Sequence, residues 1–316
     1  MNASQAAEVI QVLPPDSPLR EPALRLVLSG TTRRNPSVDE RVRILTDTVA
    51  AQGMNLDLLV VATRGKRMTA ASLAVESPGR SAVIHPGPLH DPDSGHKLLV
   101  RLLRELQDRA WQRDIVLLQA MTDPNETRLE RLFADAGLRF LAELIYAERV
   151  RGTPAPTGGG LPKLELLTYS PERHDLFCGG LEPTYAQSLD CAGLSGVRRT
   201  EDVLAGHRAT GRHDPSLWFL ARLDGAAVGV LLLAPLRDRN VLEVAYMGVA
   251  CGFRRRGVGH ALMHKCNDEM TARGFDGVTL AVDSVNTSAR ALYRAWGFVE
   301  TGRRRAWIAV RPGERS

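Results

Sequence analysis

The chain shows the same order of predicted elements twice, once in each half of its 316 residues. Each half reads strand, two helices, hairpin, strand, helix, strand, helix and a terminal strand. The closing helices match position by position, because residues 132–138 read LFADAGL and residues 292–298 read LYRAWGF. Strands alternating with helices predict an α/β (α+β) fold, and the repetition predicts a tandem duplication.

A segment rich in Gly, Pro and Thr separates the two halves. Residues 151–163 read RGTPAPTGGGLPK and contain few large apolar side chains. This composition is typical of an interdomain linker. We therefore expect one domain at 1–150, a linker at 151–163 and a second domain at 164–316.

The second half contains a strong hairpin signal, Asp224-Gly225 between two apolar runs. Before it we expect a strand at 164–169 and helical segments at 171–189 and 201–211. After it the pattern predicts strands at 241–250 and 278–282, helices at 257–273 and 286–296, and a final strand pair within 298–310. The first half follows the same order, with helices at 19–28, 38–51, 97–111 and 126–136 and strands at 9–13, 58–62, 68–75, 81–84, 115–118 and 140–149.

Composition limits the classes of protein that fit this chain. The sequence is 44% hydrophobic and 24% charged, as in globular proteins with a full core. It has no apolar run long enough for a membrane span, and its first residues do not resemble a secretion signal. The four cysteines show no C-x-x-C spacing, which argues against zinc and against disulfides. We expect a cytoplasmic protein with no metal and no membrane partner.

Positive charge is modest and clustered. The net charge is +5, and much of the excess lies in two arginine triplets, at 254–256 and 303–305. A nucleic-acid-binding chain would carry a broader basic surface. We therefore do not expect nucleic acid as the principal partner.

The first arginine triplet lies in a strand–turn–helix pattern at residues 241–259, which read VLEVAYMGVACGFRRRGVG. Gly257 and Gly259 let the backbone approach a ligand closely. The helix that follows presents unpaired N–H groups and the positive end of its dipole. This combination predicts a binding site for a diphosphate-bearing ligand.

Two motifs in this half resemble those of the GNAT superfamily of acyl-CoA-dependent N-acetyltransferases. The phosphate-binding signature of that family is Arg or Gln, two residues, Gly, one residue, then Gly or Ala, and residues 254–259 satisfy it. Its later signature is an Asn-initiated helix with a Tyr shortly before Gly-Phe, which Asn286, Tyr293 and residues 297–298 satisfy. The duplicated layout also resembles that of mycothiol synthases.

The resemblance implies two tandem GNAT-like domains, each with a mixed, mostly antiparallel sheet flanked by helices. The strand at 241–250 should part from the strand at 278–282 and leave a V-shaped slot for the pantetheine arm. The cofactor would be acetyl-CoA, used as a co-substrate. The residues implied in its binding are Met247, Gly248, Val249, Arg254, Arg255, Arg256, Gly257, Val258, Gly259, His260, Asn286, Ala289 and Arg290.

The implied activity is direct transfer of an acetyl group to a primary amine of an unidentified small molecule or peptide. Tyr293 would protonate the departing thiolate, and Glu243, or a water molecule, would take the proton of the amine. Cys251 leaves a covalent acetyl-enzyme route open. The family has an aromatic residue in its penultimate strand where this chain has Ala281. We expect a monomer or a homodimer.

Other readings of the same residues remain open. Gly257 and Gly259 could begin a dinucleotide-binding fingerprint with Asp283 as ribose ligand, but Leu262 occupies the third glycine position. A P-loop would need Gly-Lys-Ser/Thr, which is absent. The glycines could also only shape a helix start. The alternative function is a non-catalytic acyl-CoA-binding or sensor module.

The first half lacks the residues that would carry the chemistry. Its corresponding loop, at 85–96, has no arginine and contains Asp91 and Asp93, which would repel a diphosphate. Phe133 stands where Tyr293 stands in the second half and has no proton to give. We predict that 1–150 is a degenerate, non-catalytic copy.

Overall fold

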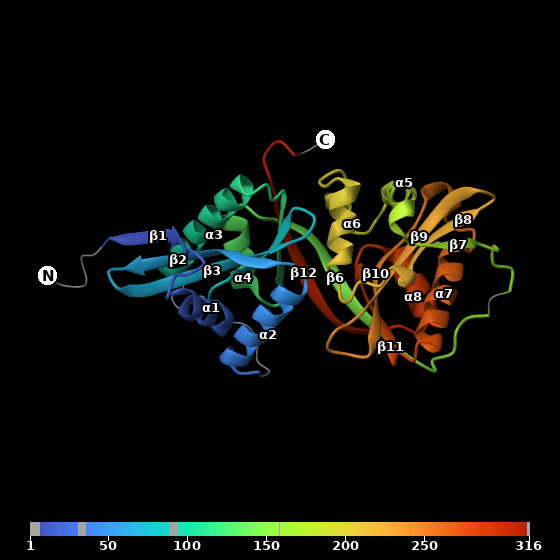
Figure 1. The fold of residues 1–316 in the computed structure, drawn as a ribbon, viewed down its shortest axis with the longest axis horizontal. Helices are drawn as coiled ribbons and strands as arrows, with labels where there is room; N and C mark the ends of the chain where they lie inside the picture. The colour runs from blue at the N-terminus through green and yellow to red at the C-terminus, as the bar shows by residue number, and fades with distance from the viewer. Residues whose placement is uncertain (1–6, 31–35, 89–93, 158, 315–316) are drawn as a thin grey trace. The chain divides into compact units, whose positions relative to one another are not determined.

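The computed structural model describes residues 7–30, 36–88, 94–157 and 159–314. The chain divides into two compact units (Figure 1). Unit 1 comprises Met1–Leu141 and Ala306–Ser316, and unit 2 comprises Ala142–Arg305. Both contain mixed sheet flanked by helices, as the sequence predicts.

Unit 1 is built on the strand order β1-β2-β3-β4-β5, with the last part of β12 beside β5. Strand β2 alternates between two cores: Leu58 and Val60 pack with α3 and α4, whereas Leu59 and Val61 pack with α1. A strand buried on both faces explains the continuous apolar run in the sequence. The elements are β1 (Glu8–Val12), α1 (Arg20–Ser29), α2 (Val38–Ala51), β2 (Asn55–Arg64), β3 (Arg67–Ser77), β4 (Ser81–Pro86), α3 (Ser94–Gln112), β5 (Leu117–Thr122), α4 (Thr127–Asp135) and the start of β6 (Arg139–Val150).

Unit 2 repeats this architecture with the strand order β12-β6-β11-β10-β9-β8-β7. One core joins α7 and α8 to the sheet, and another joins α5 and α6 to it. Its helices and strands are β7 (Glu165–Thr168), α5 (His174–Tyr185), α6 (Thr200–Arg208), β8 (Trp218–Leu223), β9 (Ala226–Pro235), β10 (Val241–Val249), α7 (Val258–Ala272), β11 (Gly277–Asp283), α8 (Thr287–Ala295) and β12 (Val299–Val310). Short 3₁₀ turns lie at Pro171–Arg173, Ala192–Leu194, Pro215–Leu217 and Cys251–Phe253.

Strands β10 and β11 run parallel and then part. Their pairing covers Val241↔Gly277, Leu242↔Val278 and Glu243↔Thr279 and does not continue beyond Glu243. Strand β10 stays paired with β9 on its other side, with a register shift between Val244 and Tyr246. A bulge of this kind bends a strand. The predicted V-shaped opening between these two strands is confirmed.

The terminal strands of the two halves are exchanged between the units. Residues 144–150 of β6 pair with β11 in unit 2, from Leu144↔Asp283 to Val150↔Gly277. In unit 1, Trp307 of β12 packs 6.2 Å from Phe133 between ring centroids, and the Arg311 amide donates to the Val116 carbonyl. These units therefore differ from the sequence boundaries of 1–150 and 164–316.

The sequence predicted most elements of unit 2 but misplaced two features. The hairpin at Asp224-Gly225 is confirmed as the β8–β9 turn. The final strand pair within 298–310 is wrong, because Val299–Val310 forms one continuous strand with no turn at Gly302. The helix expected to reach 189 ends at Tyr185. In unit 1, β5 begins at Leu117 rather than at 115. No helix in the described ranges has the length and apolar character to cross a membrane.

Candidate functional site

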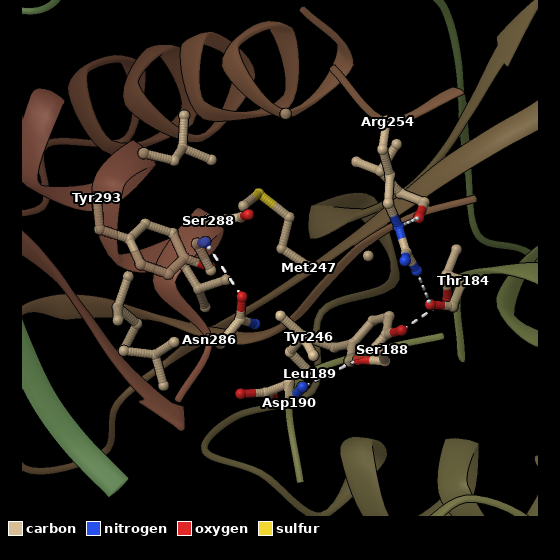
Figure 2. A pocket seen from close by; sticks show the side chains of 18 of the residues that line it. Thr184, Ser188, Leu189, Asp190, Tyr246, Met247, Arg254, Asn286, Ser288 and Tyr293 are labelled. Carbon is tan, nitrogen blue, oxygen red and sulfur yellow. Dashed lines mark hydrogen bonds between the residues drawn. The ribbon is translucent and has the colours of Figure 1, made fainter. Parts of the chain in front are cut away.

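A cavity of about 710 Å³ opens where β10 and β11 part (Figure 2). Its wall is formed by β10, β11, the start of α7, one side of α8 and the loop after α5. The lining includes these sequence-predicted residues: Met247, Gly248, Val249, Arg254, Arg255, Gly257, Gly259, His260, Asn286, Ala289 and Tyr293.

The start of α7 presents backbone N–H groups at this cavity. Gly257 has φ 80°, a left-handed conformation that favours glycine, and Arg255 has φ 61°. The first recorded bond of the helix runs from the Ala261 amide to the Gly257 carbonyl, at 3.0 Å. The amides of the first turn therefore have no partner within the helix, and its dipole adds positive potential. This is an anion-binding geometry.

Arg254 has a different set of partners from the one the sequence suggested. Its guanidinium donates to the carbonyls of Val249 (3.0 Å), Gln187 (2.9 Å), Ala186 (2.7 Å) and Thr184 (3.2 Å). Figure 2 shows this side chain beside Thr184. Arg254 thus fastens the loop after α5 to the end of β10 and shapes the cavity wall.

The main chain of β10 leaves hydrogen-bonding groups on the side of β11. The Ala250 amide donates to the Val228 carbonyl, so the main-chain groups of Ala250 face β9. Successive residues of a strand direct their main-chain groups to opposite sides, and the groups of Met247 and Val249 therefore point away from β9. Both residues line the cavity beyond the last β10–β11 pair. A polar, extended ligand could bond there as an additional strand does.

Helix α8 brings Asn286 and Tyr293 to the cavity. The Asn286 side chain caps the helix by accepting a bond from the Ala289 amide at 3.2 Å. Tyr293 is 8% exposed and lines the cavity. Burial raises the pKa of the Tyr293 hydroxyl well above its usual range, and Asp190, Cys266 and Tyr246 add to the rise. The phenol therefore keeps its proton at neutral pH.

Glu243 lies just outside the lining residues, at the last paired position before β10 and β11 separate. Burial raises the pKa of its carboxyl group. Glu243 pairs with Thr279, and Ala281 pairs with Tyr146 of β6, so these side chains share one face of the sheet. Tyr146 thus supplies an aromatic ring beside Ala281. The position of Tyr146 could not be predicted, because no motif in the first half of the sequence indicates where β6 pairs.

Asp190 is a second lining residue that the sequence did not single out. Its Oδ1 accepts a bond from the Asp283 amide at 2.9 Å. Burial raises the pKa of Asp190, and the hydrogen bond from the Asp283 amide opposes that rise. A carboxyl group in this wall places a negative charge, or a proton, within reach of a bound ligand. Asp190 was not predicted because it lies in a loop whose sequence matches no recognisable motif.

Three of the residues predicted to bind the cofactor do not line the cavity. Val258 is 1% exposed in the core, and the Arg256 guanidinium stacks 5.5 Å from the Phe253 ring centroid. Arg290 donates to the Ser284 carbonyl at 2.8 Å. The Cys251 thiol contacts the Gln187 side chain at 3.1 Å and is outside the lining set as well. The His260 ring lines the cavity and accepts a bond from the Trp296 indole at 3.2 Å.

Known proteins resemble this chain in both sequence and fold. A mycothiol acetyltransferase of Beutenbergia cavernae is 40% identical over 86 residues, which cover 27% of this chain and 29% of the relative. N-acetyltransferase family 8 member 3 of Rattus norvegicus is 30% identical over 91 residues, 28% of this chain and 40% of the relative. The chain thus spans well under half the length of these curated relatives.

Two solved structures match nearly the whole chain. A GCN5-related N-acetyltransferase from Sphaerobacter thermophilus superposes with a TM-score of 0.64 at 20% identity, covering 98% of both chains. A tandem GNAT protein from the clavulanic acid biosynthesis pathway superposes with a TM-score of 0.53 at 16% identity, covering 96% of this chain and 98% of that one. These likenesses show the tandem fold. The Acetyltransferase (GNAT) family model matches residues 186–298 of this chain, which include most of the cavity wall.

Proposed function

We propose that unit 2 is an acetyl-CoA-dependent N-acetyltransferase that transfers the acetyl group directly to a primary amine. One observation carries this proposal: Gly257, Gly259 and His260, at the start of α7, line the same cavity as Tyr293. The first feature suits a diphosphate, and the second suits a departing thiolate. The match of residues 186–298 to the GNAT family model supports acetyl transfer as the general chemistry.

Different groups in the cavity would bind different parts of the cofactor. The amides of residues 255–260 would hold the diphosphate, and the main chain of Met247 and Val249 would bond the pantetheine arm. Acetyl-CoA supplies an activated acetyl thioester. Main-chain donors on β10 would stabilise negative charge on the carbonyl oxygen of that thioester. Arg254 acts as a positioning residue, because its donors are engaged by four carbonyls of the wall.

Two side chains would transfer protons, one from the attacking amine and one to the departing thiolate. Amines are mostly protonated at neutral pH, so an acceptor must take a proton before the amine attacks. Glu243 has a raised pKa and lies where the strands part, which suits a base acting directly or through water. Tyr293 keeps its proton until the thiolate departs. The face that carries Glu243, Ala281 and Tyr146 would receive the acceptor.

An acceptor screen on the full chain tests this function. The assay measures release of CoA thiol from acetyl-CoA with amino acids, peptides, aminoglycosides and other small amines. We expect at least one amine to release thiol in equal amount to the acetylated product. Tyr293→Phe should abolish that release. Tight acetyl-CoA binding without transfer to any amine would instead indicate an acyl-CoA-binding module.

A further inference from the structure

We propose that His174, Cys178 and Glu201 form a binding site for a divalent cation of the zinc class. Their ligand atoms all lie within 4.8 Å of one another. The His174 Nε2 atom lies 2.7 Å from Glu201 Oε2 and 3.7 Å from Cys178 Sγ, and Sγ lies 3.3 Å from Glu201 Oε1. Tetrahedral zinc with bonds of 2.0–2.3 Å separates such ligands by roughly 3.4–3.6 Å. Shifts of well under 1 Å would therefore admit the ion.

The local sequence explains why these donors meet. His174 and Cys178 lie four residues apart on α5, so their side chains share one face of the helix. Glu201 lies in the first turn of α6, which packs against α5. Imidazole, thiolate and carboxylate are the zinc ligands found in proteins. The earlier expectation of no metal rested on the missing C-x-x-C spacing, which does not test a site made by two helices.

A supporting shell surrounds the imidazole. The Tyr169 hydroxyl lies 3.0 Å from His174 Nδ1 and also accepts a bond from Arg208. With an ion bound, the Tyr169 oxygen would accept a bond from Nδ1–H, and Nε2, which here contacts the Glu201 carboxylate, would bind the ion. Arg208 Nη2 lies 3.3 Å from Nδ1, and its positive charge would oppose a cation. On binding the ion, Cys178 would lose the thiol proton that it donates here to Glu201 Oε1, and the resulting thiolate and the Glu201 carboxylate would together outweigh that single charge.

The proposed ion would link α5 to α6 and would not take part in acetyl transfer. His174 and Cys178 lie in the first part of α5, whereas Thr184 near its end lines the cavity. Thr184 bonds the Tyr246 hydroxyl at 2.6 Å and offers its carbonyl to Arg254. A clip between α5 and α6 would thus restrain one wall of the cavity from a distance. The side chains of His174 and Glu201 are 25% and 56% exposed, so an ion can enter from solvent and keep a water ligand.

Cobalt(II) binding to the reduced full chain tests the site. The metal-free protein is titrated with Co²⁺ while absorbance is followed in the near ultraviolet and visible. We expect one equivalent to produce a thiolate-to-cobalt charge-transfer band and tetrahedral ligand-field bands, both removed by Zn²⁺. Binding without the charge-transfer band would overturn the proposal, because it would exclude Cys178 as a ligand.

Variants distinguish this site from adventitious binding. Cys178→Ser and His174→Ala should weaken Co²⁺ binding by more than about a hundredfold, and Tyr169→Phe by about 10- to 100-fold. Glu201→Gln alters an exposed side chain and should weaken binding without affecting the fold. Cys191→Ser, a matched change at a thiol outside the cluster, should leave the spectrum unchanged. Equal binding by Glu201→Gln and by the parent chain would show that no such site exists.

Discussion

Helices α4 and α8 occupy corresponding positions in the two units, but their aromatic residues have different surroundings. Phe133 of α4 is 0% exposed and packs in a core cluster with Trp307. Tyr293 of α8 is 8% exposed and lines the cavity. The same helix position thus contributes to packing in unit 1 and faces a ligand-sized space in unit 2.

The backbone around these helices is more alike than the side chains. Strands β4 and β5 pair in parallel only from Ser81↔Leu117 to Val83↔Gln119, just as β10 and β11 pair over three positions before parting. Parted strands are therefore a property of the fold and do not by themselves indicate chemistry. What distinguishes unit 2 is the turn with Arg255 and Gly257 and the hydroxyl of Tyr293. The corresponding loop of unit 1, with Asp91 and Asp93, lies outside the described residues, so the degenerate role of 1–150 stays a prediction.

Replacing the hydroxyl group of Tyr293 removes the main chemical difference between α8 and α4. Tyr293→Phe makes α8 resemble α4 and should lower kcat by about 10²- to 10⁴-fold, the usual contribution of a general acid. Acetyl-CoA affinity should change little, because the ring remains in place. Steady-state kinetics and calorimetry measure the two quantities. Tyr185→Phe removes a hydroxyl outside the lining set and should leave kcat unchanged. Equal kcat in Tyr293→Phe and in the parent would remove Tyr293 from the mechanism.

A second change makes the anion turn of unit 2 resemble the acidic loop of unit 1. Gly257→Asp introduces a side chain at φ 80° and a carboxylate beside the diphosphate position. Like charges in contact cost several kcal/mol, so acetyl-CoA should bind at least about a hundredfold more weakly. Calorimetry measures the dissociation constant.

The matched control for that change is Gly252→Asp, where an added Cβ meets no atom within 4 Å and φ is not positive. Binding there should remain within a few-fold of the parent. Undiminished binding by Gly257→Asp would contradict the placement of the diphosphate at α7.

The pH dependence of transfer sharpens the role of Glu243. A base must be ionised, and burial raises the pKa of Glu243, so kcat/KM should fall as pH drops through that raised value. Glu243→Gln should lower kcat/KM by about a hundredfold and remove this acidic limb. Glu300→Gln, at an exposed carboxyl group, should retain it. An unchanged acidic limb in Glu243→Gln would assign the proton acceptor to another group.

The smallest expected effect comes from the reverse substitution in unit 1, which adds a hydroxyl group to α4. Phe133→Tyr places a hydroxyl in a fully buried core and should lower the free energy of unfolding by about 1–3 kcal/mol. Tyr293→Phe should change that free energy much less. Urea denaturation of the full chain compares the two variants. Equal stability of Phe133→Tyr and the parent would show that α4 also faces a space able to hydrate a hydroxyl.

The sequence predicted the local elements and the glycine turn before α7 because both depend on short-range patterns. Asn286 and Tyr293 were found because they lie at fixed positions on one helix. The hydrogen bonds of Arg254 were not predictable, since three of its four carbonyl partners lie about seventy residues earlier in the chain. Tyr146 and the cluster of His174, Cys178 and Glu201 were missed for the same reason: strand pairing and helix packing bring them together.

The exchange of β6 and β12 between the two units determines what happens when the chain is truncated to one half. A chain that starts at Leu164 lacks residues 144–150 and would leave seven positions of β11 without their neighbour. A chain that stops at Val150 lacks Trp307 and the strand beside β5. Exposed strand edges of this kind recruit other chains and promote aggregation. We therefore expect neither half to fold stably when it is produced alone.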